Sequence, residues 1–130
     1  MSETRSHADP LDFTGMSVIV TGGTRGLGRV IARTFLDAGA DVLVCARNAP
    51  DSPVTSSDGE RPASFVAADV RDADQVAAAV AAAVESAGRL DVLVNNAGGA
   101  PPADSATVSP RFNEKILALN LTGPMTFSQA

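Results

Sequence analysis

The most informative stretch of this sequence is Met16-Ser17-Val18-Ile19-Val20-Thr21-Gly22-Gly23-Thr24-Arg25-Gly26-Leu27-Gly28. It opens with a short apolar run at 16–20 that glycines interrupt, which is typical of a buried parallel strand. After the glycines the apolar residues recur with the period of a helix. These residues are Leu27, Ile31, Phe35 and Ala38. We therefore expect a strand, a glycine turn and a helix that ends at Gly39.

The alternation of strands and helices continues along the chain. Short apolar runs predict further strands at 41–45, 64–68 and 90–94. The stretch 48–63 is rich in Pro, Ser and Asp, and its prolines make a regular helix unlikely to form. We expect a surface loop there.

Two more helices have recognisable caps. Asp72 can cap a helix with Gln75 at the reciprocal position, and Gly88 can end that helix. Its buried face is expected to comprise Val76, Val80 and Val84. Ser109-Pro110 is a good cap and first-turn pair for a last helix that continues toward the C-terminus.

Strands joined by helix-length connections imply a parallel sheet with right-handed crossovers. The predicted class is α/β, a Rossmann-type doubly wound parallel sheet that is incomplete, with its first four strands and their flanking helices present. Residues 1–12 are expected to be a disordered tail, because almost nothing in them could enter a core. Residues 13–130 are expected to form one nucleotide-binding domain, truncated at its C-terminal side.

Composition excludes several classes of function. The 130 residues carry a formal charge of −5, and an acidic chain without a basic patch argues against a nucleic-acid partner. Cys45 and His7 are the only residues of their types, so neither a disulfide framework nor a metal site is expected. No apolar run is long enough to span a bilayer, and residues 1–12 lack a signal-peptide pattern. A soluble, cytoplasmic protein is the default expectation.

The glycine turn has the character of a phosphate site. Gly22, Gly26 and Gly28 lie between a strand and a helix, where backbone N–H groups and the helix N-terminus favour an anion. The spacing differs from Gly-x-Gly-x-x-Gly, because Ile31 stands at the last position. It also differs from a P-loop, because Arg29-Val30 replaces Lys-Ser/Thr. The alternative is that the glycines merely end a strand.

Four motifs together resemble one family. Thr21-Gly22-x-x-x-Gly26-x-Gly28 resembles the cofactor fingerprint of the short-chain dehydrogenase/reductase family, and so does Asn95-Asn96-Ala97-Gly98 after the fourth strand. Asp69-Val70 after the third strand and Asn120 in the last helix match in kind and order. The resemblance covers the chain beyond residue 12. It implies an NAD(P)-dependent oxidoreductase that transfers hydride between nicotinamide and a small-molecule carbonyl or alcohol.

The resemblance also implies cofactor-binding roles. Asp69 would hydrogen-bond the adenine amine beside the Val70 backbone, with a turn-forming role of Asp69 as the alternative. Asn95 is expected to be structural, tying the fourth strand to a neighbour. The cofactor-binding residues expected in the two loops are Gly22, Thr24, Arg25, Gly26, Leu27, Gly28, Asn96, Ala97 and Gly98.

The end of the second strand indicates which cofactor is preferred. NAD sites place an acidic residue there, whereas an Arg accommodates the extra phosphate of NADP. In this chain Ala46 occupies the acidic position and Arg47 follows it, while Arg25 could reach the same phosphate. NADP(H) is therefore preferred and NAD(H) is possible. The alternative is that Arg47 is a solvated loop charge.

The resemblance implies that a Tyr acts as general acid/base, with Lys, Ser and Asn in support. Asn120 matches the Asn, although a core amide is the alternative, and the chain contains no Tyr. Lys115, the only lysine, is read as a solvated charge.

Either the chain is a fragment of a longer enzyme, which alone would be inactive, or it is a non-catalytic nucleotide-binding or interaction module. The fragment is favoured, because the apolar fourth strand would otherwise be an open edge. The last helix would likewise expose an apolar face. Its apolar residues are Phe112, Ile116, Leu119, Leu121, Met125 and Phe127. In the family this helix contributes to subunit contacts, so a homo-oligomer is expected.

Overall fold

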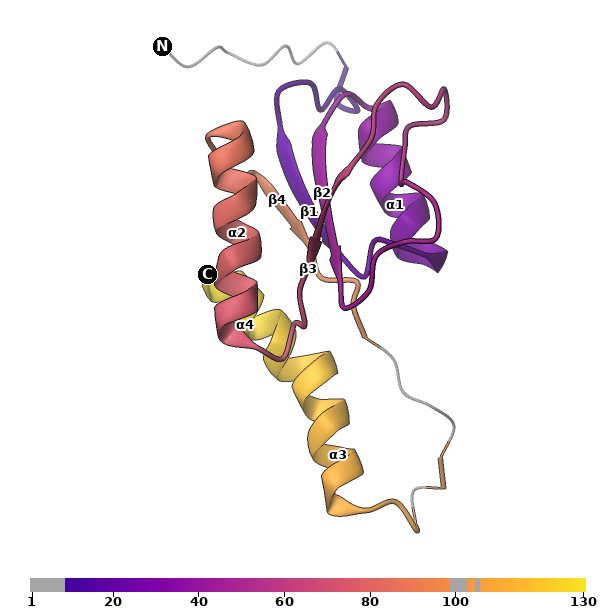
Figure 1. Ribbon diagram of the computed structural model, residues 1–130, viewed down its shortest axis with the longest axis vertical. Helices are drawn as coiled ribbons and strands as arrows, with labels where there is room; N and C mark the ends of the chain where they lie inside the picture. The colour runs from indigo at the N-terminus through magenta and orange to yellow at the C-terminus, as the bar shows by residue number, and fades with distance from the viewer. Residues whose placement is uncertain (1–8, 99–102, 105) are drawn as a thin grey trace.

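A four-stranded parallel sheet forms the centre of the protein (Figure 1). The computed structural model describes residues 9–98, 103–104 and 106–130. The strand order is β3-β2-β1-β4. The strands are β1 Ser17–Thr21, β2 Asp41–Ala46, β3 Ser64–Ala67 and β4 Val92–Val94. All three pairings are parallel, which confirms the predicted α/β class.

Helices cover both faces of the sheet (Figure 1). They are α1 Gly26–Asp37, α2 Ala73–Ala87, α3 Pro110–Leu117 and α4 Gly123–Gln129, with a π-helical turn, η1 Ala118–Thr122, between the last two. One core cluster joins Val18, Val20 and the α1 side. The other joins Ile19 to α2 and α4. Alternate residues of β1 therefore serve the two cores, as the period of a strand requires.

The buried faces of α1 and α2 differ in part from those expected. Helix α1 buries Gly28, Ala32 and Leu36, whereas Leu27 is 70% exposed. Helix α2 buries Val76 as predicted, but Ala79 and Ala83 complete its buried set. Val84 is 42% exposed, so its predicted burial is wrong. Small buried residues let each helix backbone lie close to the sheet. A prediction based only on large apolar side chains overlooks these small buried positions.

The predicted caps are present, with one difference. The Asp72 side chain accepts from the backbone N–H groups of Asp74 and Gln75, and Gly88 ends α2 at φ +77°. The reciprocal bond is absent among the described contacts, because the Asp72 N–H already donates to the Asp69 carbonyl at 3.0 Å. The Gln75 Oε1 instead accepts from the Asp69 N–H at 2.9 Å. Ser109 caps α3 as predicted.

The loop between β2 and β3 contains no regular helix, as expected, but it is firmly attached to the body of the protein. Val54 is buried in the α1-side core. Asp37 accepts from the Ser57 backbone and hydroxyl. Arg33 Nε donates to the Thr55 carbonyl at 3.3 Å, and an Arg61 terminal nitrogen donates to carbonyls at the end of α1. Tertiary hydrogen bonds therefore fix a segment that local sequence leaves irregular.

Strand β4 occupies the sheet edge beside β1. Their amino ends are joined by Asp91, whose carboxylate accepts from the Ser17 N–H at 2.8 Å. The Asp91 N–H donates to the Ser17 carbonyl at 2.9 Å, and Arg89 pairs with the same carboxylate.

The last helical segment packs more fully than its sequence suggests. Phe127 is 2% exposed and belongs to the core beneath α2, so its expected place on an exposed face is wrong. Leu117, Leu121 and Met125 are each more than half exposed. Met125 and Phe127 lie two residues apart on α4, so they project from opposite sides of that helix.

Only part of the expected disordered tail lies within the described residues. Residues 1–8 lie outside them, and 9–12 form a turn in which the Asp12 N–H donates to the Asp9 carbonyl. In the part of the chain that the structure describes, no helix is long and apolar enough to cross a membrane.

Candidate cofactor-binding site

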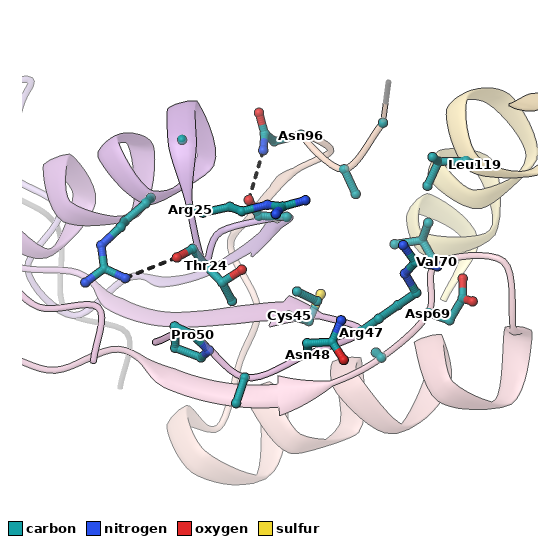
Figure 2. A pocket seen from close by; sticks show the side chains of 18 of the residues that line it. Thr24, Arg25, Cys45, Arg47, Asn48, Pro50, Asp69, Val70, Asn96 and Leu119 are labelled. Carbon is teal, nitrogen blue, oxygen red and sulfur yellow. Dashed lines mark hydrogen bonds between the residues drawn. The ribbon is translucent and has the colours of Figure 1, made fainter. Parts of the chain in front are cut away.

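A cavity of about 710 Å³ opens where the strands end (Figure 2). The glycine turn, the chain after β2, residues 68–71 and residues 96–98 line it. Ten predicted site residues meet there: Gly22, Thr24, Arg25, Gly26, Arg47, Asp69, Val70, Asn96, Ala97 and Gly98. Leu27, Gly28 and Asn120 are not among its lining residues. The residues brought together are mainly those that follow strands, because parallel strands end at one edge.

The glycine turn has the shape that a phosphate requires. Gly22 and Gly26 adopt φ values of +65° and +58°, a region that favours glycine. A Cβ at Gly26 would meet nothing within 4 Å, so the backbone there faces open space in the cavity. The first turn of α1 contains no acidic residue. Together these features fit an anionic group at the helix N-terminus.

Gly28 serves packing instead. A Cβ at this position would overlap the Gly22 carbonyl and the Asn96 side-chain amide. The buried glycine therefore lets α1 start directly beneath the turn.

Thr21 and Asn96 tie the glycine turn to the loop after β4. Thr21 Oγ1 donates to the Val94 carbonyl and accepts from the N–H groups of Asn96 and Ala97 at 3.0 and 2.9 Å. Asn96 Nδ2 donates to the Gly22 carbonyl at 3.2 Å. Thr21 was not among the predicted binding residues, although a hydroxyl directly after the apolar run Val18-Ile19-Val20 was a readable signal.

Arg25 and Arg47 are two of the four arginines that line the cavity, the others being Arg29 and Arg71. Arg25 projects from the glycine turn, and Arg47 follows β2 and extends toward Asp69 and Val70 (Figure 2). Ala46, at the end of β2, carries no charge that would repel a phosphate. Arg25 and Arg47 are therefore suited to bind a phosphate group, which is larger than a sugar hydroxyl and negatively charged.

Asp69 is held by Arg71, which was not among the predicted site residues. The guanidinium donates to Asp69 Oδ1 at 2.9 Å and to Oδ2 at 2.7 Å, and the Arg71 backbone N–H also donates to Oδ1 at 2.9 Å. The Arg71 side chain is the main cause that lowers the pKa of Asp69 to about 2. The turn-forming alternative for Asp69 is therefore present in the structure, and the carboxylate also lines the cavity.

Asn95 and Cys45 have structural positions. Asn95 Nδ2 donates to Ser128 Oγ at 3.3 Å, so the neighbour to which it ties β4 is α4. Burial raises the pKa of the Cys45 thiol to about 12, which keeps it protonated and unreactive near neutral pH. Among the described residues, no group of three or more His, Cys, Asp or Glu side chains is placed to hold a metal ion.

The comparison with known proteins agrees with this geometry. The family model described as short chain dehydrogenase matches residues 16–130. The chain belongs to the short-chain dehydrogenase/reductase family. Its folding pattern is thus the Rossmann type that the family shares.

Several dehydrogenases are similar to the chain. It is 39% identical over 116 residues to the L-fucose dehydrogenase of Oryctolagus cuniculus, covering 88% of this chain and 40% of that protein. The RhlG–NADP active-site complex of Pseudomonas aeruginosa matches with a TM-score of 0.80 and 34% identity, over 92% of this chain and 47% of that one. The ligand-free aldohexose dehydrogenase of Thermoplasma acidophilum matches with a TM-score of 0.79 and 30% identity, over 91% and 43%. The chain thus spans less than half the length of these short-chain dehydrogenase/reductase relatives.

Asn120, which the sequence predicts to match the family's Asn, lies in the π turn η1. Its Nδ2 donates to the Ile116 carbonyl at 3.0 Å, and the residue is exposed, so the alternative of a buried core amide does not apply. A Cβ at Gly98 would lie 2.7 Å from Asn120 Oδ1. Gly98 therefore allows the loop after β4 to pass directly beside Asn120.

Proposed function

We propose that this chain is the cofactor-binding part of an NADP(H)-dependent oxidoreductase of the short-chain dehydrogenase/reductase type. The proposed domain comprises residues 13–130. The observation that carries the proposal is the cavity at the strand ends, which is lined by an open glycine turn carrying Arg25 and by Arg47 from the chain after β2. The cofactor would accept or supply the hydride, and the substrate would be a small-molecule carbonyl or alcohol.

The proposed preference for NADP(H) rests on charge. Arg25 and Arg47 border the same cavity, and the position in which NAD sites carry an acidic side chain is Ala46. A guanidinium can bind a phosphate through two parallel hydrogen bonds. The similar RhlG of Pseudomonas aeruginosa was solved as an NADP complex. NAD(H) would bind as well, with one phosphate contact fewer.

The remaining binding roles follow from the positions of the residues. Gly22, Thr24, Gly26 and the start of α1 would face the pyrophosphate, and Leu27 and Gly28 would contribute through the backbone of that helix turn. Asp69 and Val70 would border the adenine. Asn96, Ala97 and Gly98 would border the ribose.

The proposed chemical role of this chain is limited. Asn120 lies beside Gly98 and would help to orient a proton relay to the substrate oxygen. The family's Tyr acid/base has no counterpart here, because the chain contains no Tyr. We therefore expect this 130-residue chain to bind NADPH without turnover, whereas the whole enzyme would catalyse the reaction.

The relatives support the proposed substrate class. L-fucose dehydrogenase and aldohexose dehydrogenase are named for the oxidation of sugars. We propose a cytoplasmic homo-oligomer for the whole enzyme. The oligomer is supported by exposed apolar side chains at a spacing of four residues, Leu117, Leu121 and Met125.

Calorimetric titration with NADPH and NADH tests the proposal. We expect NADPH to bind the chain more tightly, and Arg47→Ala to weaken NADPH binding by about tenfold or more through the loss of a charge-assisted contact. Arg111→Ala serves as the control, because this exposed arginine on α3 does not line the cavity. Equal affinities for the two cofactors would contradict the NADP(H) preference, and binding of neither would contradict the proposed function.

A further inference from the structure

The guanidinium of Arg29 connects two segments that line the cavity. One terminal nitrogen donates to the Thr24 carbonyl at 3.1 Å and to the Ser52 carbonyl at 3.0 Å. The other donates to Ser52 Oγ at 3.0 Å and to the Pro53 carbonyl at 2.8 Å. Arg29 lies in the first turn of α1, so a helix side chain joins the glycine turn to the loop after β2.

These contacts leave Arg29 little capacity to bind a phosphate itself. Each terminal nitrogen of a guanidinium carries two N–H donors, and four bonds to the protein match those four donors. The accepting atoms are three carbonyl oxygens and one hydroxyl. Arg29 is half-buried, whereas Arg25 and Arg47 are exposed. All three arginines line the cavity, but protein acceptors already occupy the terminal N–H groups of Arg29.

The two segments that Arg29 joins are those that carry the exposed Arg25 and Arg47. Thr24 directly precedes Arg25, and Ser52 lies five residues after Arg47. We infer that Arg29 is a positioning residue that fixes the Arg25 and Arg47 segments relative to each other, and thereby sets the preference for a cofactor with a 2′-phosphate. The inference rests on the proposed NADP(H) function. Its physical basis is preorganisation, because two cations held at a fixed separation lose less freedom when they bind one dianion.

Arg33 supplies a matched control. It also projects from α1 and holds the same loop, through the Thr55 carbonyl. No described bond joins it to the glycine turn. Loss of Arg33 should therefore loosen the loop without uncoupling Arg25 from Arg47.

The experiment compares Arg29→Lys, Arg29→Met and Arg33→Met in the full chain. Dissociation constants for NADPH and NADH are measured by calorimetry, and hydrogen exchange is followed at the amides of residues 48–54. Lysine keeps the charge but cannot donate in the four directions that a planar guanidinium can. We expect both Arg29 variants to weaken NADPH binding by about tenfold and NADH binding by less than about twofold. Exchange at 48–54 should rise, and Arg33→Met should keep the NADPH/NADH ratio.

Each other result overturns the inference. Near-normal NADPH binding by Arg29→Lys, with a loss in Arg29→Met, would mean that Arg29 acts through its charge. An unchanged ratio in both variants would mean that the segments are positioned without it. An equal loss for NADPH and NADH would indicate general disruption of the turn. If the unsubstituted chain bound NADPH and NADH equally well, both the proposed NADP(H) specificity and this inference would be wrong.

Discussion

At the scale of single residues, two glycines of the glycine turn have different structural roles. Gly26 has open space where a side chain would point, whereas Gly28 is enclosed by the Gly22 carbonyl and the Asn96 amide. The sequence predicted that both glycines belong to a phosphate site, because their spacing and place after a strand are readable. It could not predict which one faces the ligand, since that depends on the loop after β4, about 70 residues away in sequence.

This difference predicts unequal costs of substitution. Gly28→Ala places a methyl group against backbone, so we expect a loss of about 3 kcal/mol in the free energy of unfolding. Gly26→Ala meets no neighbour and incurs mainly the left-handed strain, about 1 kcal/mol. Urea denaturation of the two variants measures both values. A smaller loss for Gly28→Ala than for Gly26→Ala would contradict the packing role.

At the scale of secondary-structure elements, helix and strand order was predictable because local periodicity and caps carry it. The capping residues Asp72, Gly88 and Ser109 all act where the sequence places them. Two features were not predicted. The π turn at Ala118–Thr122 directly precedes Gly123-Pro124, and Pro124 has no N–H to donate to the Asn120 carbonyl. The arginines that attach the loop 48–63 look like ordinary surface charges.

Phe127 is the one large side chain of α4 that is buried. Phe127 lies among α2 residues with 2% exposure, whereas Met125, on the same helix, is 53% exposed. We expect Phe127→Ala to lower the free energy of unfolding by about 3–5 kcal/mol. Met125→Ala should change it by less than about 0.5 kcal/mol.

Chemical denaturation of both variants is the measurement. Similar small losses would show that α4 is not held by the Phe127 contact.

At the scale of the whole molecule, acidic side chains at the end of α1 and in two loops accept hydrogen bonds that favour their ionised form. Bonds from Ser57 lower the pKa of Asp37, and a bond from the Ser56 hydroxyl lowers that of Asp58. The Arg71 side chain lowers the pKa of Asp69 to about 2. The fold therefore favours ionised carboxylates at several separate places.

This arrangement predicts acid sensitivity. A carboxylate whose folded pKa lies below its unfolded value stabilises the fold above about pH 4, and the contribution is lost as the pH falls toward the folded value. For Asp69 this window runs from about pH 4 to about pH 2. Thermal unfolding midpoints should fall through that window, and Arg71→Gln should flatten part of the decline.

Arg111→Gln is the matched control, because this exposed arginine has no role in the Asp69 pair. An unchanged pH profile in Arg71→Gln would show that the pair does not contribute to acid sensitivity.

The pairing of β1 with β4 has a consequence for the order in which the protein is made. The contact between Ser17 and Asp91 joins residues 74 positions apart. At a synthesis rate of ~5–20 residues per second, roughly 4–15 s pass between the two ends of that contact. During this interval one side of β1 has no strand of its own chain to bind. A chaperone that covers the unpaired side of β1 would therefore act mainly in this interval, before β4 has been made.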